Sequence, residues 1–284
     1  MTNPVSKCIF CGTVGVTKEH VFPHWSHKYL PPRPKGKAIG IKVFKLLDGQ
    51  KSSLVKMNGA MRDWQIACVC GGDHTTCNNG WMRALEDKAR PILVPLIEGN
   101  ETRLMASDQG IIAAWAALKA MVVEYDRIAN VTTNHVWRKY MRINSLAPPR
   151  GWGIWIGHYD RKDWRPEWIS HPLRILDGKN AKCGAGKPVT RFNSQSTTQV
   201  IGKLFIQIIR CPVVGVVEGW RFAAPHSGTL FRIWPPNGYS IVWPGLPMTD
   251  IDADRTATAF FNFAFRVGLP QARAAIAHGD HPKN

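Results

Sequence analysis

The chain has 284 residues, 44% of them hydrophobic and 20% charged, which is enough apolar material to bury a core and excludes a disordered tail. Its 37 Lys and Arg exceed its 20 Asp and Glu, and the net charge of +17 favours a polyanionic partner, most simply nucleic acid. No apolar run reaches the ~18 residues of a membrane span, because Lys119 interrupts the nearest candidate, at 111–123. Residues 1–7 contain no apolar signal segment, so we expect a cytoplasmic protein without membrane contact.

Five of the seven cysteines fall before residue 80, and such clustering without an export signal indicates metal binding rather than disulfides. Cys8 and Cys11 form a CxxC turn followed by glycine, which directs two thiolates at one metal ion. The other thiolates follow about sixty residues later. We expect one structural Zn²⁺, completed by Cys77 and by either Cys68 or Cys70, of which we prefer Cys70.

The dipeptide Glu19–His20 lies between the two cysteine groups and is followed by Val, Phe and Pro23. An imidazole can take a proton from a water while a carboxylate holds a divalent cation on the scissile phosphate. Neighbours on a strand point to opposite faces, but a bent strand end can direct both toward one phosphate. The dipeptide alone is also typical of an ordinary surface pair, and the flanking cysteines give it weight. His24 and His27 follow at helical spacing, and we interpret them as part of a helix starting at Pro23 rather than as zinc ligands.

Residues 28–56 contain eight basic residues and one acidic residue, together with three prolines and three glycines. This composition predicts an extended loop followed by a short strand at 39–47. Such a run is either a solvated face or a loop that faces phosphates, and we favour the second interpretation. The residues expected to contact the nucleic-acid backbone are Lys35, Lys37, Lys42 and Lys45.

Hydrophobic periodicity predicts five helices. They are expected at 80–90, ended by Pro91, at 107–125, capped by Ser107, and at 134–143, 197–209 and 253–267. The helix at 134–143 carries Arg138, Lys139 and Arg142 on one face, which is typical either of a helix that faces DNA or of an ordinary amphipathic surface helix.

Short β-branched and aromatic runs predict strands between these helices. One is expected at 153–157, and two others at 229–234 and 239–243. The last two are separated by the turn-rich residues 235–238, Pro-Pro-Asn-Gly, and this arrangement predicts a hairpin.

Together, the CxxC turn, the Glu19–His20 dipeptide with Pro23, and Cys77–Asn78–Asn79 at a helix start resemble the HNH (ββα-metal) endonuclease superfamily in its zinc-supported form. The resemblance covers about residues 5–95. It implies two strands and a helix stapled by the zinc thiolates. It also implies that Glu19 and Asn78 hold a catalytic Mg²⁺ or Mn²⁺ and that His20 is the general base, with Asn79 as the alternative amide ligand.

Two features depart from the family pattern. Glu19 stands where an Asp is more usual, and six residues separate Cys70 from Cys77 where two are expected. The inserted Asp73 and His74 are either additional ligands or, as we prefer, part of a longer zinc loop.

These observations predict an α+β protein with two parts. Residues 1–100 are expected to form the zinc-stapled HNH domain, and residues 101–284 a mixed α+β domain for which nucleic-acid binding is one candidate role. The expected function is a metal-dependent endonuclease that hydrolyses phosphodiester bonds, with double-stranded DNA as the first choice of substrate. The alternative is a zinc-stapled nucleic-acid-binding protein without catalytic activity.

Overall fold

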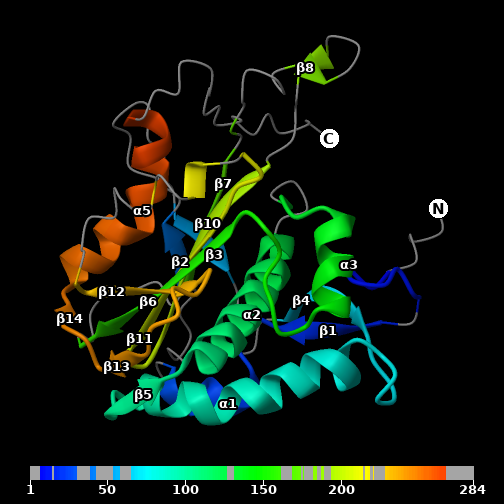
Figure 1. Ribbon diagram of the computed structural model, residues 1–284. Helices are drawn as coiled ribbons and strands as arrows, with labels where there is room; N and C mark the ends of the chain where they lie inside the picture. The colour runs from blue at the N-terminus through cyan, green and yellow to red at the C-terminus, as the bar shows by residue number, and fades with distance from the viewer. Residues whose placement is uncertain are drawn as a thin grey trace.

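The computed structural model describes residues 7–14, 16–30, 39–42, 54–57, 65–126, 131–160, 168–173, 175, 182–183, 187–188, 193–213, 215–217, 220 and 228–266. Within these residues the chain is a mixed α+β protein whose helices pack on both faces of a central sheet (Figure 1).

The central sheet has six strands. They are β6 (Trp152–Tyr159), β7 (Trp168–Leu173), β10 (Ser194–Ile201), β11 (Leu204–Arg210), β12 (Leu230–Trp234) and β14 (Pro247–Met248). The order β12-β6-β11-β10-β7 is antiparallel throughout, and the short β14 pairs in parallel with the end of β6. β6, β10 and β11 are buried along their whole length, which means that both faces of the sheet are covered.

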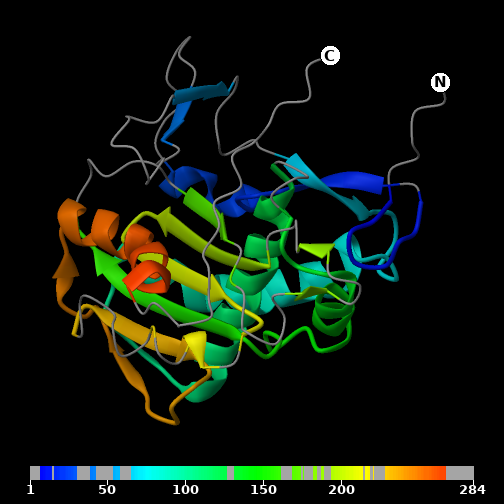
Figure 2. The same cartoon turned by 90° about the horizontal axis from the view of Figure 1, so that it is seen from above.

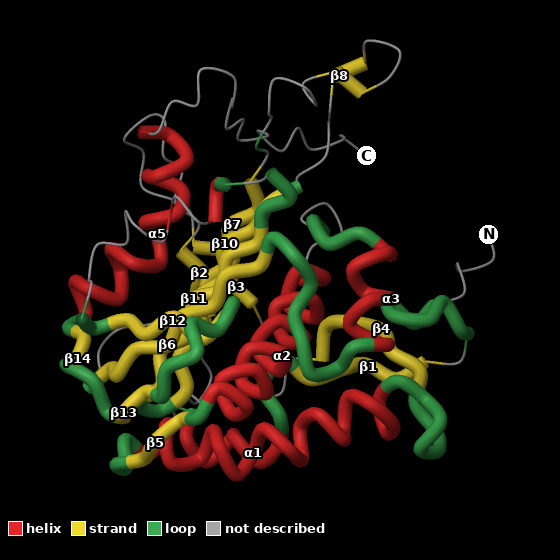
Figure 3. Tube along the Cα trace, in the orientation of Figure 1, coloured by secondary structure: helices red, strands yellow, loops and turns green. Residues whose placement is uncertain are grey.

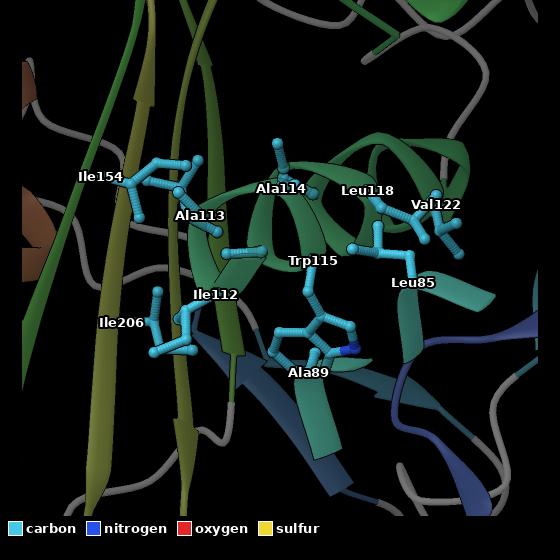
Figure 4. Close-up of a cluster of buried hydrophobic side chains, with 14 of the residues drawn as sticks. Leu85, Ala89, Ile112, Ala113, Ala114, Trp115, Leu118, Val122, Ile154 and Ile206 are labelled. Atoms are coloured by element: carbon cyan, nitrogen blue, oxygen red, sulfur yellow. The ribbon is translucent and has the colours of Figure 1, made fainter. Parts of the chain in front are cut away.

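Helices α2 (Ala106–Val123) and α5 (Asp250–Arg266) cover opposite faces of this sheet (Figures 1 and 2). Because successive side chains of a strand alternate between faces, Ile154 and Ile206 pack toward α2, as Figure 4 shows. Trp155 belongs to a separate cluster on the other face, together with Phe260 of α5.

Helix α1 (Arg83–Glu98) lies beside α2 on the side away from the sheet (Figure 3). The Trp115 ring points toward Ala89 of α1 in Figure 4, and both residues are fully buried. The helix ends at Gly99, whose φ of 76° is left-handed and favours glycine.

The chain before α1 forms a small module at one end of α2. Strand β1 (Val16–His20) pairs antiparallel with β4 (Gln65–Cys70). Between β1 and β4 in the sequence come the 3₁₀ helix η1 (His24–Tyr29) and the hairpin of β2 (Ile39–Lys42) and β3 (Leu54–Met57). The π-helical turn η3 (Asn78–Met82) leads from this module into α1. That these elements form an HNH domain stays a prediction.

The remaining described elements are short. They are β5 (Thr102–Leu104) paired with β13 (Ile241–Trp243), η4 (Glu124–Asp126), α3 (His135–Ile143), and β8 (Lys182–Cys183) paired with β9 (Lys187–Pro188).

One hydrophobic cluster spans the boundary expected near residue 100. It joins Cys8, Val69 and Leu85 of the N-terminal part to Trp115 and Ile206 of the C-terminal part. The division into domains at residues 1–100 and 101–284 stays a prediction.

The helix expected at 197–209 is wrong, because these residues form β10 and β11. Ile201 pairs with Leu204, so the connection is a two-residue turn at Gly202 and Lys203, and Gly202 has a φ of 53°. Burial on both faces removes the polar–apolar alternation of a strand, so its apolar residues can be mistaken for a buried helix.

The prediction of a hairpin from residues 229–234 and 239–243 is also wrong. Both segments are strands, but β12 pairs with β6 and β13 pairs with β5. Each segment therefore has a partner from another part of the chain, and the local turn signal at 235–238 connects two sheets instead of two paired strands.

Two predicted helix ends differ as well. Pro91 does not end α1, which continues through Pro91 and Pro95 although each proline removes a helical hydrogen bond and crowds the preceding turn. Leu93 and Leu96 beyond Pro91 are fully buried, and their burial offsets this cost. Ser107 does not cap α2, which begins one residue earlier, and the Asp108 carboxylate accepts the Met105 backbone N–H at 2.9 Å.

The helix expected at 134–143 is confirmed as α3, with Asn134 as its cap. Its basic face is smaller than the sequence indicated, because Arg138 is buried and donates to Glu124 at 2.7 Å. Lys139 and Arg142 remain exposed. No helix in the described part of the chain combines the length and hydrophobicity needed to cross a membrane.

A buried polar network ties α3 to the sheet. Glu124 accepts hydrogen bonds from Arg138 and from the backbone N–H groups of Thr132 and Thr133. Arg210 of β11 lies 4.0 Å from the Trp137 ring centroid, and burial lowers the pKa of its guanidinium to about 10, which leaves it charged at neutral pH. Glu124 is therefore a buried counter-charge for two guanidinium groups.

We predict that Glu124→Gln lowers the free energy of unfolding by about 3–5 kcal/mol, because buried charges lose their partner. Urea unfolding followed by tryptophan fluorescence measures the difference. The control is Asp87→Asn, which breaks an exposed ion pair with Arg83 and is expected to change stability by less than about 0.5 kcal/mol. Equal effects of the two substitutions would show that the Glu124 network contributes little.

Candidate active site

Four cysteines gather at one end of the N-terminal module. The sulfur atoms of Cys8, Cys11, Cys70 and Cys77 all lie within 4.8 Å of one another, close enough to bind one metal ion. Bonds of about 2.3 Å to a tetrahedral Zn²⁺ place thiolates about 3.8 Å apart, so the observed cluster matches a site of this size. Cys70 rather than Cys68 is the third residue of the cluster, as preferred from the sequence.

Backbone hydrogen bonds place these thiols. The Cys8–Cys11 turn is closed by Gly12 N–H donating to the Cys8 carbonyl at 2.9 Å, and Ile9 N–H donates to the Cys68 carbonyl of β4 at 3.0 Å. Cys77 N–H donates to the Cys70 sulfur at 3.0 Å. The turn, the strand end and the helix start therefore converge on one point.

The thiols are electrostatically coupled. A hydrogen bond from Cys77 lowers the pKa of Cys8 to about 4, and the same contact raises the pKa of Cys77. Burial raises the pKa of Cys70. Of Cys8, Cys70 and Cys77, Cys8 is therefore the first to become a thiolate, and a bound cation would favour the thiolate form of the other two.

Hydrogen bonds within the loop between Cys70 and Cys77 stabilise its conformation. The Asp73 carboxylate accepts from the N–H and the hydroxyl of Thr75, and neither Asp73 nor His74 belongs to the metal-ligand group found in the described part of the chain. A Cβ on Gly80 would lie 2.4 Å from the His74 carbonyl oxygen, so the helix start needs glycine to pass this loop. The Asn79 side-chain N–H donates to the Gly72 carbonyl, and this hydrogen bond joins the loop to the start of η3.

Glu19 is buried in an ion pair. Its Oε1 accepts from the Lys119 ammonium of α2 at 2.7 Å, and the same ammonium lies 3.6 Å from Oε2 of Glu86 on α1. Burial alone would lower the pKa of Lys119, but the two carboxylates outweigh it and hold that pKa above its ordinary value. Lys119 is therefore charged although none of it is exposed.

His20 is the last residue of β1, next to an irregularity in the strand pairing. Glu19 pairs with Ala67 and His20 with Gln65, so β4 contains one extra residue, Ile66, at this point. Gln65 Nε2 lies 2.8 Å from His20 Nε2. Because an amide nitrogen only donates, His20 Nε2 accepts and carries a lone pair. The extra residue lies on β4, so whether Glu19 and His20 point toward one phosphate stays a prediction.

Asn78, at the start of η3, contacts strand β1. Its amide nitrogen donates to the Thr17 hydroxyl at 3.2 Å, and Thr17 is two residues before Glu19 on β1. Residues two apart on a strand share a face, so Asn78 and Glu19 lie on one side of β1. The structure thus places the helix start against β1 at Thr17, on the face of the strand that carries Glu19.

The other histidines lie nearby without forming a ligand group. His24 and His27 belong to η1, which begins after Pro23 as the sequence indicated. Their ring centroids are 5.0 Å apart, and those of His20 and His27 are 6.3 Å apart. Among the described residues, the four cysteines are the only group of at least three His, Cys, Asp or Glu side chains placed to share a metal ion.

The basic residues expected to contact phosphates are mostly outside the described residues. Lys35, Lys37 and Lys45 fall there, and Lys42 is the last residue of β2, whose side chains are not described. Their role stays a prediction.

Three residues near the dipeptide were not found from the sequence: Lys119, Glu86 and Gln65. Lys119 carried a usable signal, because it is the only charged residue in the run 111–123 and a buried lysine requires an acidic partner. Nothing in the sequence distinguished Glu86 or Gln65 from ordinary exposed residues.

Comparisons with protein-family models, with curated proteins and with solved structures found no match to this chain.

We predict that the purified protein contains about one metal ion per chain, held by the four thiolates. Cys8→Ser should reduce the bound metal to well below one equivalent and destabilise the N-terminal module, because metal binding and folding are coupled in such sites. Elemental analysis and circular dichroism measure both effects.

Cys68→Ser is the matched control, since Cys68 lies on the same strand but outside the cluster. A metal-free protein with an unchanged spectrum, or equal metal loss in both variants, would contradict the assignment.

Proposed function

We propose that this protein hydrolyses phosphodiester bonds of nucleic acid, with double-stranded DNA as the first substrate to test, in a ββα-metal module of the HNH type. The observation that carries the proposal is the meeting of three segments. The end of β1 bears Glu19 and His20, β4 pairs with it, and the helix start after Cys77 brings Asn78 to the same side of β1.

The cysteine cluster supports a structural zinc ion in this module. Four thiolates form a soft donor set, which Zn²⁺ and other thiophilic ions prefer over Mg²⁺ or Mn²⁺. Cys70 ends β4 and Cys77 immediately precedes η3, so the ion would hold together the two strands and the helix.

The donors at the end of β1 fit a second, harder cation. Oε1 of Glu19 is occupied by Lys119, whereas Oε2 accepts no hydrogen bond from any described residue. Asn78 uses its nitrogen on Thr17, which leaves the amide oxygen for a ligand. These two oxygens suit Mg²⁺ or Mn²⁺. When bound there, the cation would offset the negative charge that develops on the phosphate and the leaving oxygen.

His20 is positioned to act as the general base. Its Nε2 carries a lone pair and contacts Gln65, an exposed side chain that a water molecule and a phosphate can displace. The imidazole would take a proton from a water in line with the scissile bond. The carbonyl of His20 is 3.3 Å from the Lys119 ammonium, which fixes the peptide behind the ring.

A second function is favoured by one observation. The Glu19 carboxylate already has a buried cationic partner, and an ionised pair of this kind is stable without any divalent ion. A zinc-stapled protein that binds nucleic acid without cutting it would have the same geometry. Salt-sensitive binding without hydrolysis would favour this alternative.

We predict that His20→Ala reduces cleavage of supercoiled plasmid about 10²–10⁴-fold in Mg²⁺ or Mn²⁺ while binding is retained, because only the general base is removed. Gel assays over a time course measure the rate, and the products should carry 5′ phosphates, as the family resemblance implies.

His24→Ala is the matched control, since this exposed histidine lies four residues away on η1 and should be cleavage-neutral. Equal cleavage by His20→Ala and wild type would place any nuclease centre elsewhere.

A further prediction concerns binding by the basic segment. Replacing Lys35, Lys37, Lys42 and Lys45 with Gln should weaken binding to all DNA sequences alike. It should also reduce the salt dependence, by up to ~0.9 in the log–log slope for each lost phosphate contact.

The control removes the same charge from exposed positions outside this segment: Lys88, Arg103, Arg150 and Arg255. Fluorescence anisotropy at several salt concentrations compares the two proteins. If both slopes change equally, only net charge matters and the segment is a solvated loop.

A further inference from the structure

We propose that Lys119 is a positioning residue of this site: it holds Glu19 and the His20 peptide in place and sets the net charge that a divalent cation meets there. The inference rests on the proposed function, because it concerns the same cation.

The geometry shows that Lys119 contacts both members of the dipeptide. Its ammonium lies 2.7 Å from Oε1 of Glu19 and 3.3 Å from the His20 carbonyl oxygen. None of the lysine is exposed, and it extends from α2, a helix whose other buried residues are apolar except for Gln109. Because α2 also packs on the central sheet, the end of β1 is fixed relative to the main body of the protein.

Glu86 completes the arrangement. Its Oε2 lies 3.6 Å from the Lys119 ammonium, and its Oε1 accepts from the Trp25 indole N–H at 3.0 Å. Trp25 belongs to η1, directly after the Glu19–His20 dipeptide and Pro23. The second carboxylate is therefore held by two neighbours and stays close to the ammonium.

Lys119, Glu19 and Glu86 form a charged triad. The net charge of this triad decides how strongly the site attracts a cation. Two carboxylates and one ammonium leave a single net negative charge. With a neutral residue at 86 the triad would be neutral, and with a neutral residue at 119 it would carry two negative charges. The free oxygen of Glu19 is the part of the triad that would face the cation, so the affinity for a hard divalent ion should follow this charge.

Three variants test this dependence: Glu86→Gln, Lys119→Met and the double variant. Titration of zinc-loaded protein with Mn²⁺, followed by the electron paramagnetic resonance of free Mn²⁺, measures affinity without nucleic acid. We expect Glu86→Gln to weaken Mn²⁺ binding about 10- to 100-fold and Lys119→Met to strengthen it. The double variant, which restores one net negative charge, should return toward wild type.

Lys119→Met leaves two carboxylates without a cation. If this variant does not fold, the comparison of Glu86→Gln with the double variant and with Lys119→Arg carries the test. Lys119→Arg keeps the charge and should keep the wild-type affinity. Circular dichroism of each variant establishes that it is folded. In a cleavage assay the double variant should lower kcat with little change in KM, because the His20 peptide loses its anchor.

Unchanged Mn²⁺ affinity in Glu86→Gln, or a double variant that binds as weakly as Glu86→Gln, would overturn the inference and make the triad purely structural. Affinities that follow the charge in proteins that never cut DNA would uphold it, and only the proposed hydrolysis would then fail.

Discussion

A lysine buried in the middle of an apolar helix constrains the whole N-terminal module. Lys119 has no exposed surface, and a buried ammonium is tolerated only with anionic partners. Glu19 supplies one from β1 and Glu86 supplies another from α1. The ion pairs therefore fix three segments around one atom: the strand that carries the candidate base, the helix that follows the cysteine cluster, and the helix that packs on the central sheet.

The cysteine cluster acts on the same module from the other end of β1. It joins the Cys8–Cys11 turn, the end of β4 and the start of η3. The two centres differ in chemistry, since one offers four sulfur atoms and the other offers carboxylate and amide oxygens. Under the proposed function, a soft ion and a hard ion would bind at separate places, one supporting the fold and the other supporting catalysis. Between them, Thr17 contacts Asn78 and links the helix start to β1.

The sequence predicted the parts of this protein that depend on local chemistry. The cysteine spacing identified the cluster, including Cys70, and the apolar stripes located α2 and α3. It failed where long-range pairing decides the structure. Residues 197–209 are apolar enough for a buried helix, and only the pairing of β10 with β11 and their neighbours makes them strands. In the same way, the partner of Lys119 is one hundred residues away, so its ion pair with Glu19 is invisible to local patterns.

The most direct test of the proposed active site is the position of its metal ions. Anomalous diffraction from crystals soaked in Mn²⁺, recorded at the zinc and manganese edges, locates both kinds of ion. We expect a zinc peak among the sulfur atoms of Cys8, Cys11, Cys70 and Cys77, and a manganese peak about 2.2 Å from Oε2 of Glu19 and from the Asn78 amide oxygen. A manganese peak elsewhere, or none near Glu19 at saturating Mn²⁺, would contradict the proposal that the end of β1 is a metal-dependent nuclease centre.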